Sequence, residues 1–394
     1  MESFFRTHKH LVEHLNAPVR RALMDEIDWS DRLIGIKGAR GVGKTTFLLQ
    51  YAQERYGADD HSCLYVNTNN FYIQNVGIEA FAGEFYRQGG RVLLVDQVWK
   101  LENWSEQLHN CYTRYPNLRI VFTGSSVMRL KEENPELNGL VKSYDLRGFS
   151  LREFVNLKSG ANLPIRSFSD IMEHHVEIAE EVLRVVNPRL FMPDYLHHGY
   201  YPFFLEKSNY SENLLKTMNM MIEVDILMLK QIEQKYLARI KQLFYMLTMS
   251  GSTNPNVSQL AQELKMSRAT VMNYIKYLMD ARLVNMIYQK GESFPKKPGR
   301  VLLHNSNLMY SFYPKGFDDH DVEEAFFVNA LWKDHVVNKV GNIGAFLVDG
   351  RYEFRIIEHA TKLKSKSKIL YAVNQCDVGE GSNQIPLWLF GMLW

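Results

Sequence analysis

The chain has 394 residues, of which 46% are hydrophobic and 23% are charged, the composition of an ordinary globular protein with room for two to four domains. Its formal net charge of +2 argues neither for nor against a nucleic-acid partner, because a local basic patch is compatible with a balanced total. The three cysteines are few, odd in number and far apart, which indicates a reducing compartment without a disulfide framework. They are Cys63, Cys111 and Cys376.

No stretch reaches the length of a membrane span, and the N-terminus lacks the apolar core of a signal peptide, so we expect a soluble cytoplasmic protein. Residues 2–28 are predicted to be helical, with Pro18 starting or kinking a helix. His8, His10 and His14 lie close together in this segment. They would suit a metal site, but a solvated helix face is the preferred interpretation.

A phosphate-binding loop is the most specific motif of the chain. The stretch 38–46 contains the spacing G-x-x-x-x-G-K-[ST] at residues 38–45, between a predicted strand at 33–37 and a predicted helix at 47–55. Glycines let backbone N–H groups point at phosphate oxygens, and the helix N-terminus adds its positive end. Lys44 would reach the terminal phosphates, and the Thr45 hydroxyl would ligate Mg²⁺. The predicted nucleotide-binding residues are Gly38, Arg40, Gly41, Val42, Gly43, Lys44, Thr45 and Thr46.

Short apolar runs then alternate with helical stretches. The predicted strands are 63–67, 92–96 and 118–123, and the predicted helices are 78–88 and 103–114. A further strand around Tyr144 precedes a helix that begins at a capping box formed by Ser150 and Glu153. Strands that alternate with helices predict an α/β fold with a parallel sheet covered on both faces.

The following region is predicted to be mostly helical from 167 to 248 and then to form a helix-turn-helix with a wing. The elements of that pattern are helices at 257–264 and 268–278 and strands at 283–288 and 300–304. Ser267 would cap the second helix. If this unit binds DNA, the contacts would come from Arg268, Asn273, Lys276, Lys290, Lys296 and Lys297.

Residues 316–394 are predicted to form a small α/β domain. A helix is expected over 322–339, followed by a hairpin of strands 345–348 and 352–357. The stretch 385–390 is too apolar for a loose tail, so we expect it to dock in a core.

Hydrolytic chemistry is expected at the ends of two strands. Asp96 would hold Mg²⁺, and the next position usually carries a Glu that deprotonates the attacking water. Here it is Gln97, whose amide can position water but cannot accept its proton. Either the chain hydrolyses slowly by nature, or Gln97 replaces a Glu by engineering, which the intact remainder of the site favours. Thr123 and Ser125 would sense the γ-phosphate. The predicted catalytic residues are Lys44, Asp96, Gln97 and Ser125.

An arginine from a neighbouring subunit often completes sites of this kind. Arg129, Arg147 and Arg152 are the candidates in this chain. The sequence does not choose among them, and for each one alone a surface or structural ion pair is the better explanation.

Four stretches together resemble the AAA-type P-loop ATPases of bacteria and archaea that carry a C-terminal domain of unknown function, most closely a group common in Bacteroidetes. These stretches are 36–50, 93–100, 123–126 and 144–154. The resemblance implies ATP and Mg²⁺ as ligands and an additional-strand core with sheet order 5-1-4-3-2. It further implies a helical lid, a winged helix and a C-terminal domain that resembles a degenerate restriction endonuclease. The predicted domains are an N-terminal helical segment (1–30), the ATPase core (31–160), the lid (161–240), the winged helix (241–315) and the C-terminal α/β domain (316–394).

The chain departs from the family pattern beyond its glutamine at the base position. Residues 137–140 lack the arginines that many relatives show there, which puts an arginine finger at that place in doubt. Restriction-type nucleases need an Asp and a Glu-x-Lys on adjacent strands to hold Mg²⁺. The first strand here, 341–346, has no Asp, Asp349 sits in a turn, and Glu358 is followed two residues later by Ala360. An active nuclease is therefore not expected.

Three functions remain open. The leading one is a Mg²⁺-dependent ATPase that acts as a nucleotide-driven switch or an oligomeric motor. The alternative is a nucleotide-gated DNA-binding or defence protein that contacts DNA through 257–297. A third is a nucleotide-stabilised scaffold with little turnover, which a native Gln97 would favour. We expect a homo-oligomer, no membrane partner and no structural metal.

Overall fold

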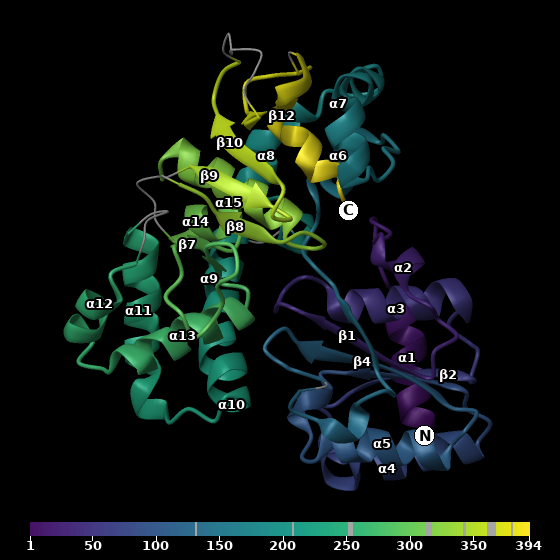
Figure 1. The fold of residues 1–394 in the computed structure, drawn as a ribbon. Coiled ribbons are helices and arrows are strands. Elements are labelled where there is room, and N and C mark those ends of the chain that lie inside the picture. The colour runs from purple at the N-terminus through teal and green to yellow at the C-terminus, as the bar shows by residue number, and fades with distance from the viewer. Residues whose placement is uncertain are drawn as a thin grey trace. The chain divides into compact units, whose positions relative to one another are not determined.

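The computed structural model describes residues 1–130, 132–206, 209–250, 255–312, 317–341, 344–360, 368–379 and 381–394. The chain divides into two compact units, Met1–Arg147 and Gly148–Trp394 (Figure 1). Each unit is described by itself. The five-domain division predicted from the sequence is finer than this and stays a prediction.

The first unit is built on a five-stranded parallel sheet with strand order β2-β3-β4-β1-β5. Read from the opposite edge, this is the predicted order 5-1-4-3-2, so the predicted α/β class and sheet are confirmed. The strands are β1 (Leu33–Gly38), β2 (Cys63–Asn67), β3 (Val92–Asp96), β4 (Arg119–Ser125) and β5 (Lys142–Asp145). Strands β1 to β4 are almost wholly buried, as near-continuous apolar strands are when helices cover both faces of a sheet.

Helix α3 lies on one face of this sheet, and α4 and α5 lie on the other (Figure 1). The helices are α1 (Glu2–Glu13), α2 (Leu23–Glu26), α3 (Lys44–Arg55), α4 (Phe71–Arg87) and α5 (Trp104–Arg114), with short 3₁₀ turns η1 (Val98–Lys100) and η2 (Pro135–Leu137). The helical prediction for 2–28 is confirmed for α1 and α2 and is wrong for the chain between them, which is irregular. Pro18 lies in this interval, where it lacks a backbone N–H and disfavours a helical conformation at the residue before it.

One histidine of α1 is part of the core. His8 is 1% exposed, and its Nδ1 accepts a hydrogen bond of 3.0 Å from the backbone N–H of Tyr65 on β2. Burial, and then the nearby His61, lower the pKa of His8 to about 4, so the ring is neutral at pH 7. The interpretation as a solvated helix face is therefore wrong for His8, whereas His10 and His14 are exposed. Among the described residues, no group of three or more His, Cys, Asp or Glu side chains could hold a metal ion.

The second unit begins with a helical region, as predicted. Its helices are α6 (Leu151–Ser159), α7 (Phe168–Leu183), α8 (Met192–His198), α9 (Tyr210–Met220), α10 (Leu227–Leu229) and α11 (Leu237–Met249), with short helical turns η3 (Pro188–Phe191), η4 (Pro202–Leu205), η5 (Met221–Ile226) and η6 (Gln234–Tyr236). The predicted capping box at the start of α6 is confirmed. The Ser150 hydroxyl accepts from the Glu153 N–H, and the Glu153 carboxylate accepts from the Ser150 N–H, both at 3.1 Å.

Two helices and a two-stranded antiparallel sheet follow, at the places where the sequence predicts them. They are α12 (Val257–Glu263), α13 (Arg268–Asp280), β6 (Val284–Ile287) and β7 (Arg300–Leu303). Ser267 caps α13 as expected, since its hydroxyl accepts from the Thr270 N–H at 3.0 Å. The buried side of α13 includes Val271, Ile275 and Leu278, which hold the helix against its neighbours.

The chain ends in a mixed five-stranded sheet of order β12-β11-β10-β9-β8, in which β8, β9 and β10 are antiparallel and β10, β11 and β12 are parallel. Its elements are α14 (Ser306–Phe312), α15 (Asp319–Leu331), β8 (Val337–Lys339), β9 (Ala345–Val348), β10 (Tyr352–Ile357), β11 (Leu370–Val373), η7 (Gly381–Asn383), β12 (Gln384–Pro386) and η8 (Leu387–Met392). The predicted hairpin is confirmed as β9 and β10. The predicted docking of the apolar end is also confirmed, because the Phe390 ring is buried against Phe327 and Phe354.

The helix predicted over 322–339 is wrong in its second half. Helix α15 ends at Leu331, and the chain turns into β8, which pairs with β9. Asp349 in the β9–β10 turn fixes this reversal: its carboxylate accepts from the Val336 N–H at 2.9 Å and lies 2.7 Å from His335 Nδ1. Cross-strand pairing therefore overrides the helical pattern.

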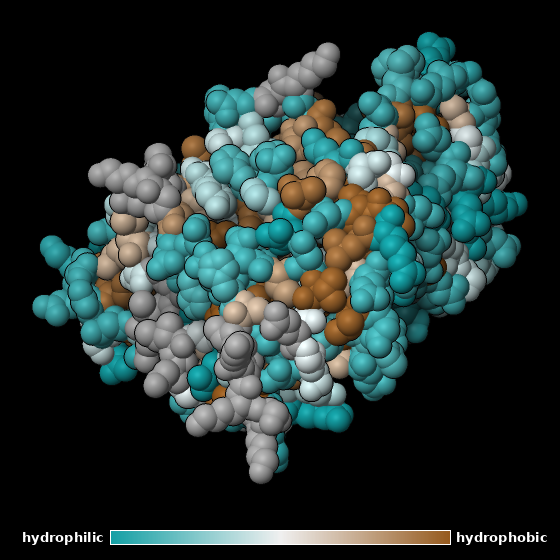
Figure 2. All heavy atoms as spheres, turned by 90° about the horizontal axis from the view of Figure 1, so that it is seen from above, coloured by the Kyte–Doolittle hydropathy of each residue, from teal (hydrophilic) through white to brown (hydrophobic). Residues whose placement is uncertain are grey.

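No helix in the described ranges is both long and apolar enough to cross a membrane. The face shown in Figure 2 is largely hydrophilic, with hydrophobic patches between the polar residues. Phe71, the first residue of α4, is 86% exposed. Its neighbour Tyr72 is 50% exposed. One or two exposed apolar side chains are common on protein surfaces and by themselves indicate no partner.

Candidate functional site

The phosphate loop connects β1 to α3, as the motif predicts. Gly43 has φ 94° and Gly41 has φ 85°, a left-handed backbone that glycine adopts without steric cost. Gly38 is required for a different reason, since a Cβ there would lie 2.3 Å from the Leu146 carbonyl oxygen. The loop conformation therefore depends on glycine at all three positions.

The lysine of the motif lies over its own loop. Lys44 Nζ donates to the carbonyl oxygens of Gly38 and Ala39, each at 2.8 Å. Its ammonium group therefore stands beside the backbone of the loop, where it could exchange these neutral acceptors for a phosphate oxygen. Thr46 is exposed in the first turn of α3, and Arg40 is partly exposed on the loop.

A buried arginine that the sequence did not single out supports this loop. Arg21 is 7% exposed, and it donates through Nη1 to the carbonyl of Val42 at 3.3 Å and through Nη2 to the carbonyl of Arg147 at 2.8 Å. It therefore ties the phosphate loop to the chain that follows β5. The helical pattern of residues 2–28 gave no indication of this contact.

Asp96 is the centre of a hydrogen-bond cluster at the carboxyl ends of the strands. It is 1% exposed, and its Oδ2 accepts from Thr45 Oγ1 at 2.7 Å and from Tyr65 OH at 2.9 Å. Asn67 Nδ2 lies 3.3 Å from the same oxygen, and Thr123 Oγ1 donates to Oδ1 at 2.5 Å. The two residues predicted to hold Mg²⁺, Thr45 and Asp96, are thus in direct contact.

Strand β2 supplies two members of this cluster that the sequence analysis missed. Tyr65 and Asn67 are two residues apart on β2 and therefore point to the same face of the sheet. Asn67 pairs with Asp96 in the register of β2 and β3. Burial, and then the charge of Asp96, raise the pKa of Tyr65 well above its usual value, so its hydroxyl stays a donor. Polar residues at alternate positions near a strand end are the signal that could have found them.

Gln97 has a constrained backbone directly beside this cluster. Its φ of 60° and ψ of 42° are left-handed, which is uncommon for a residue with a Cβ. Two hydrogen bonds hold it there, since its N–H donates to Thr123 Oγ1 at 2.8 Å and its carbonyl accepts from Thr68 Oγ1 at 2.7 Å. Its side chain is partly exposed. Thr123 therefore links position 97 to Asp96.

The remaining predicted residues lie in different settings. Ser125 is 4% exposed, and its hydroxyl accepts a long 3.4 Å hydrogen bond from the Val127 N–H in its own turn. Arg147 is 8% exposed, and Arg152 donates to the carbonyls of Leu163 and Trp394 within the second unit. Arg129 is exposed. The structure thus gives Arg152 a structural partner set and leaves the assignment of an arginine finger a prediction.

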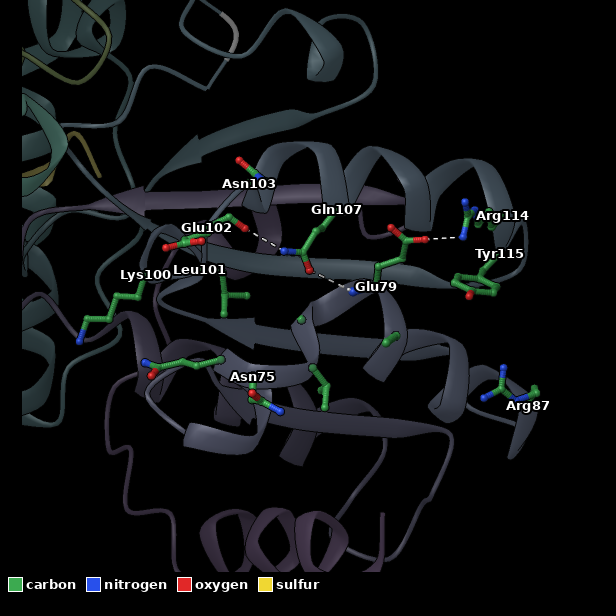
Figure 3. Close-up of a pocket in the computed structure, with 14 residues that line it drawn as sticks. Asn75, Glu79, Arg87, Lys100, Leu101, Glu102, Asn103, Gln107, Arg114 and Tyr115 are labelled. Atoms are coloured by element: carbon green, nitrogen blue, oxygen red, sulfur yellow. Dashed lines mark hydrogen bonds and ion pairs between the residues drawn. The ribbon is translucent and has the colours of Figure 1, made fainter.

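A separate cavity of about 820 Å³ lies between α4 and the chain from η1 to α5 (Figure 3). Helix α4 is kinked at Gly77, and Gln107 of α5 reaches into the kink, where its Oε1 accepts from the Ile78 N–H at 2.6 Å. Its Nε2 donates to the carbonyl of Glu102 at 2.8 Å. Glu79 in the same wall pairs with Arg114 at 2.5 Å. Much of the polar lining is thus paired within the wall, as in a packing seam between two helices.

The residues predicted to contact DNA differ in how exposed they are and in whether they are already paired within the chain. Arg268 and Asn273 are exposed on α13, whereas Lys276 is 17% exposed and paired with Asp280 at 2.6 Å. In the segment between β6 and β7, Lys296 pairs with Glu292 at 3.2 Å and Lys290 Nζ donates to the carbonyl of Gly350 at 3.1 Å. Lys297 is exposed.

Comparison with known sequences finds two separate family models, one in the N-terminal part of the chain and one further along it. A family model described as an AAA domain matches residues 30–155, and a model of a domain of unknown function, DUF8612, matches residues 191–298. An uncharacterized protein of Methanocaldococcus jannaschii, MJ1637, is 27% identical over 281 residues. This match covers 67% of the present chain and 58% of the archaeal protein, so the chain spans little more than half the length of that relative.

Solved structures offer only weak overall similarity. The Orc1 protein of Aeropyrum pernix in complex with DNA is 12% identical, with coverage of 82% of this chain and 91% of that one and a TM-score of 0.31. AMPPCP-bound DnaA from Aquifex aeolicus is 14% identical, with coverage of 70% and 86% and a TM-score of 0.26. TM-scores this far below 0.5 support no conclusion about the present chain. Residues 30–155 thus match the model of an AAA domain, and they carry the predicted parallel sheet and the phosphate-binding loop between β1 and α3.

Proposed function

We propose that the chain binds ATP with Mg²⁺ at the carboxyl ends of β1 and β3 and acts as a nucleotide-driven switch or motor. The observation that carries this proposal is the 2.7 Å hydrogen bond between the Thr45 hydroxyl and the Asp96 carboxylate. It places the last residue of the phosphate loop motif beside the acid of the neighbouring strand. Lys44 at the start of α3 adds the positive charge that terminal phosphates require.

The donor set at Asp96 suits a magnesium ion. Mg²⁺ prefers hard oxygen ligands and is bound in proteins through one or two carboxylates together with substrate phosphates. Asp96 is a buried carboxylate, and the four hydrogen bonds recorded to it come from neutral groups of Thr45, Tyr65, Asn67 and Thr123. A buried negative charge with neutral donors is expensive without a cation. Thr45 and Asp96 would hold the ion, which would neutralise charge on the phosphates.

The roles of the chain's own residues follow from their positions. The N–H groups of the loop would cradle the phosphates, and Lys44 would leave the carbonyls of Gly38 and Ala39 for them. Gln97 would orient water without accepting its proton, so turnover in this chain should be slow. Ser125 would sense the γ-phosphate. If subunits assemble, Arg129 is the exposed candidate for the arginine finger.

Replacing Lys44 tests the nucleotide site. We expect Lys44→Ala to weaken binding of a fluorescent ATP analogue at least about tenfold, since a lost charge-assisted hydrogen bond is worth about 1.5–3 kcal/mol. Lys142→Ala is the matched control, because Lys142 is an exposed lysine on β5 of the same unit. Its affinity should equal that of the unmodified chain. Equal binding by both variants, or no binding by the unmodified chain, would overturn the proposal.

The second candidate function is nucleotide-gated DNA binding. The observation that favours it is the joint exposure of Arg268 and Asn273 on α13, the helix that a winged helix would place in the major groove. The C-terminal sheet would be an inactive nuclease-like domain. Glu358 there is exposed and lies 3.5 Å from His359, while part of the strand expected to supply an Asp, residues 342 and 343, lies outside the described residues.

Salt dependence tests this second function. A plot of log affinity for duplex DNA against log salt concentration has a negative slope. We expect the double variant Arg268→Ala/Lys297→Ala to make this slope shallower by about one for each phosphate contact removed. Lys276→Ala is the comparison, and it should change the slope less because Lys276 is paired with Asp280. If the unmodified chain shows no salt-dependent retention on duplex DNA, this function is excluded.

A further inference from the structure

We propose that Tyr65 is a positioning residue that holds the Asp96 carboxylate in the orientation a divalent cation needs. This inference rests on the proposed nucleotide site and names a residue outside the motifs that define it. Its starting point is the 2.9 Å hydrogen bond from the Tyr65 hydroxyl to Asp96 Oδ2. The same oxygen accepts from Thr45 Oγ1 at 2.7 Å.

The strand geometry explains why a tyrosine is needed at this place. In the register of β2 and β3, Tyr65 lies opposite Leu94, two residues before Asp96. Two residues of strand span about 6.6 Å, which is about the reach of a tyrosine side chain from its Cα to its hydroxyl oxygen. A phenylalanine would fill the same volume and end one atom short of the carboxylate.

The backbone of Tyr65 is fixed from the opposite side. Strand β2 is an edge of the sheet, so outward N–H groups have no strand to pair with. The Tyr65 N–H donates to the buried ring of His8 instead, at 3.0 Å. With a 5% exposed ring, Tyr65 has little freedom to move its hydroxyl away from Asp96.

The donors surround both oxygens of the carboxylate. Thr123 donates to Oδ1, while Thr45 and Tyr65 donate to Oδ2. Thr45 is itself a predicted metal ligand, so its hydroxyl would bind the cation and also donate a hydrogen bond to Asp96. Of the two other donors on Oδ2, Tyr65 at 2.9 Å is closer than Asn67 at 3.3 Å. Its hydroxyl therefore keeps the carboxylate from rotating. Groups that orient a metal ligand in this way typically affect metal affinity by about 10–100-fold.

Nucleotide affinity with and without the ion tests the inference separately from turnover. The experiment measures the dissociation constant of a non-hydrolysable ATP analogue by calorimetry, once with Mg²⁺ and once with EDTA. For Tyr65→Phe we expect the gain in affinity due to Mg²⁺ to fall about tenfold, with the affinity in EDTA unchanged within about twofold. Tyr51→Phe is the matched control, since Tyr51 is a 2% exposed tyrosine on α3 in the same unit, and it should behave as the unmodified chain does.

A double-mutant cycle shows whether Tyr65 acts through Asp96. In an Asp96→Asn background, adding Tyr65→Phe should leave the remaining Mg²⁺ effect unchanged, because coupled residues are not additive. Equal losses in both backgrounds, or a Tyr65→Phe variant that loses affinity in EDTA as well, would mean that the hydroxyl is only structural and would overturn the inference. An unmodified chain that binds no nucleotide would instead defeat the proposed function itself.

Discussion

Changing Gln97 to Glu is expected to raise steady-state ATP hydrolysis by at least about 100-fold, the usual contribution of a positioned general base. The restored rate should be about 0.1–10 s⁻¹, within a decade or two of typical enzymes. The physical reason is that a carboxylate can take the proton of the attacking water, whereas the amide of Gln97 can only orient it. The backbone at position 97 should not change, since Gln and Glu have the same shape and the left-handed conformation is held by Thr68 and Thr123.

Two variants make this result interpretable. Gln97→Met keeps the length of the side chain without a proton acceptor, so its rate should be no higher than that of the unmodified chain. Lys44→Ala combined with Gln97→Glu should also stay slow, which ties the activity to the phosphate loop. If Gln97→Glu binds ATP but hydrolyses it no faster, the motor function fails, and a nucleotide-stabilised scaffold becomes the better account.

Replacing Arg300 with Met is expected to cost the second unit about 3–5 kcal/mol of unfolding free energy, the usual effect of removing one member of a buried ion pair. Arg300 on β7 and Glu324 on α15 form a hydrogen-bonded pair whose side chains are 2% and 0% exposed. Arg300 also lies 5.1 Å from the centre of the Phe346 ring. Denaturant unfolding, monitored by hydrogen exchange at β7 and α15, measures the change in unfolding free energy of this unit.

The control and the rescue separate charge from packing. Arg355→Met removes an arginine that is 51% exposed and 3.8 Å from Glu353, so it should change stability by less than about 0.5 kcal/mol. The pair Arg300→Met and Glu324→Leu should recover most of the loss, because no buried charge is then left unpaired. A double variant as unstable as Arg300→Met alone would contradict this explanation.

The stability loss of Arg300→Met should depend on pH in a definite direction. Burial opposes ionisation of Glu324, but hydrogen bonds from His320 and Arg300 hold its pKa below the usual value. Without Arg300, the folded-state pKa should rise above that of the unfolded chain. Protonated Glu324 carries no buried charge, so the variant is more stable at low pH. It loses this stability as the pH rises through the pKa of Glu324 in the folded state. The deficit of Arg300→Met should therefore be smaller at pH 5 than at pH 8.

Where local signals and tertiary packing agree, prediction from sequence succeeded. The strands 63–67 and 92–96 were predicted to the residue, because each is a short apolar run buried on both faces. The capping box of Ser150 and the cap of Ser267 were correct for a similar reason, since both depend on residues within one turn of helix. The helical predictions failed over 14–22, which contains Pro18, and over 332–339, where the pairing of β8 with β9 overrode the helical pattern.

In the candidate site, too, local motifs were predictable from the sequence, whereas contacts between distant segments were not. The sequence by itself determined the phosphate loop and the acid that faces it, because Gly38–Thr46 is a local motif and Asp96 ends an apolar strand. Only the tertiary structure decided which groups surround Asp96. Tyr65 lies 31 residues before it and Thr123 lies 27 residues after it. Their hydroxyls reach its carboxylate because parallel strands end at one edge of the sheet, and strand order is set by packing across the whole domain rather than by any local pattern.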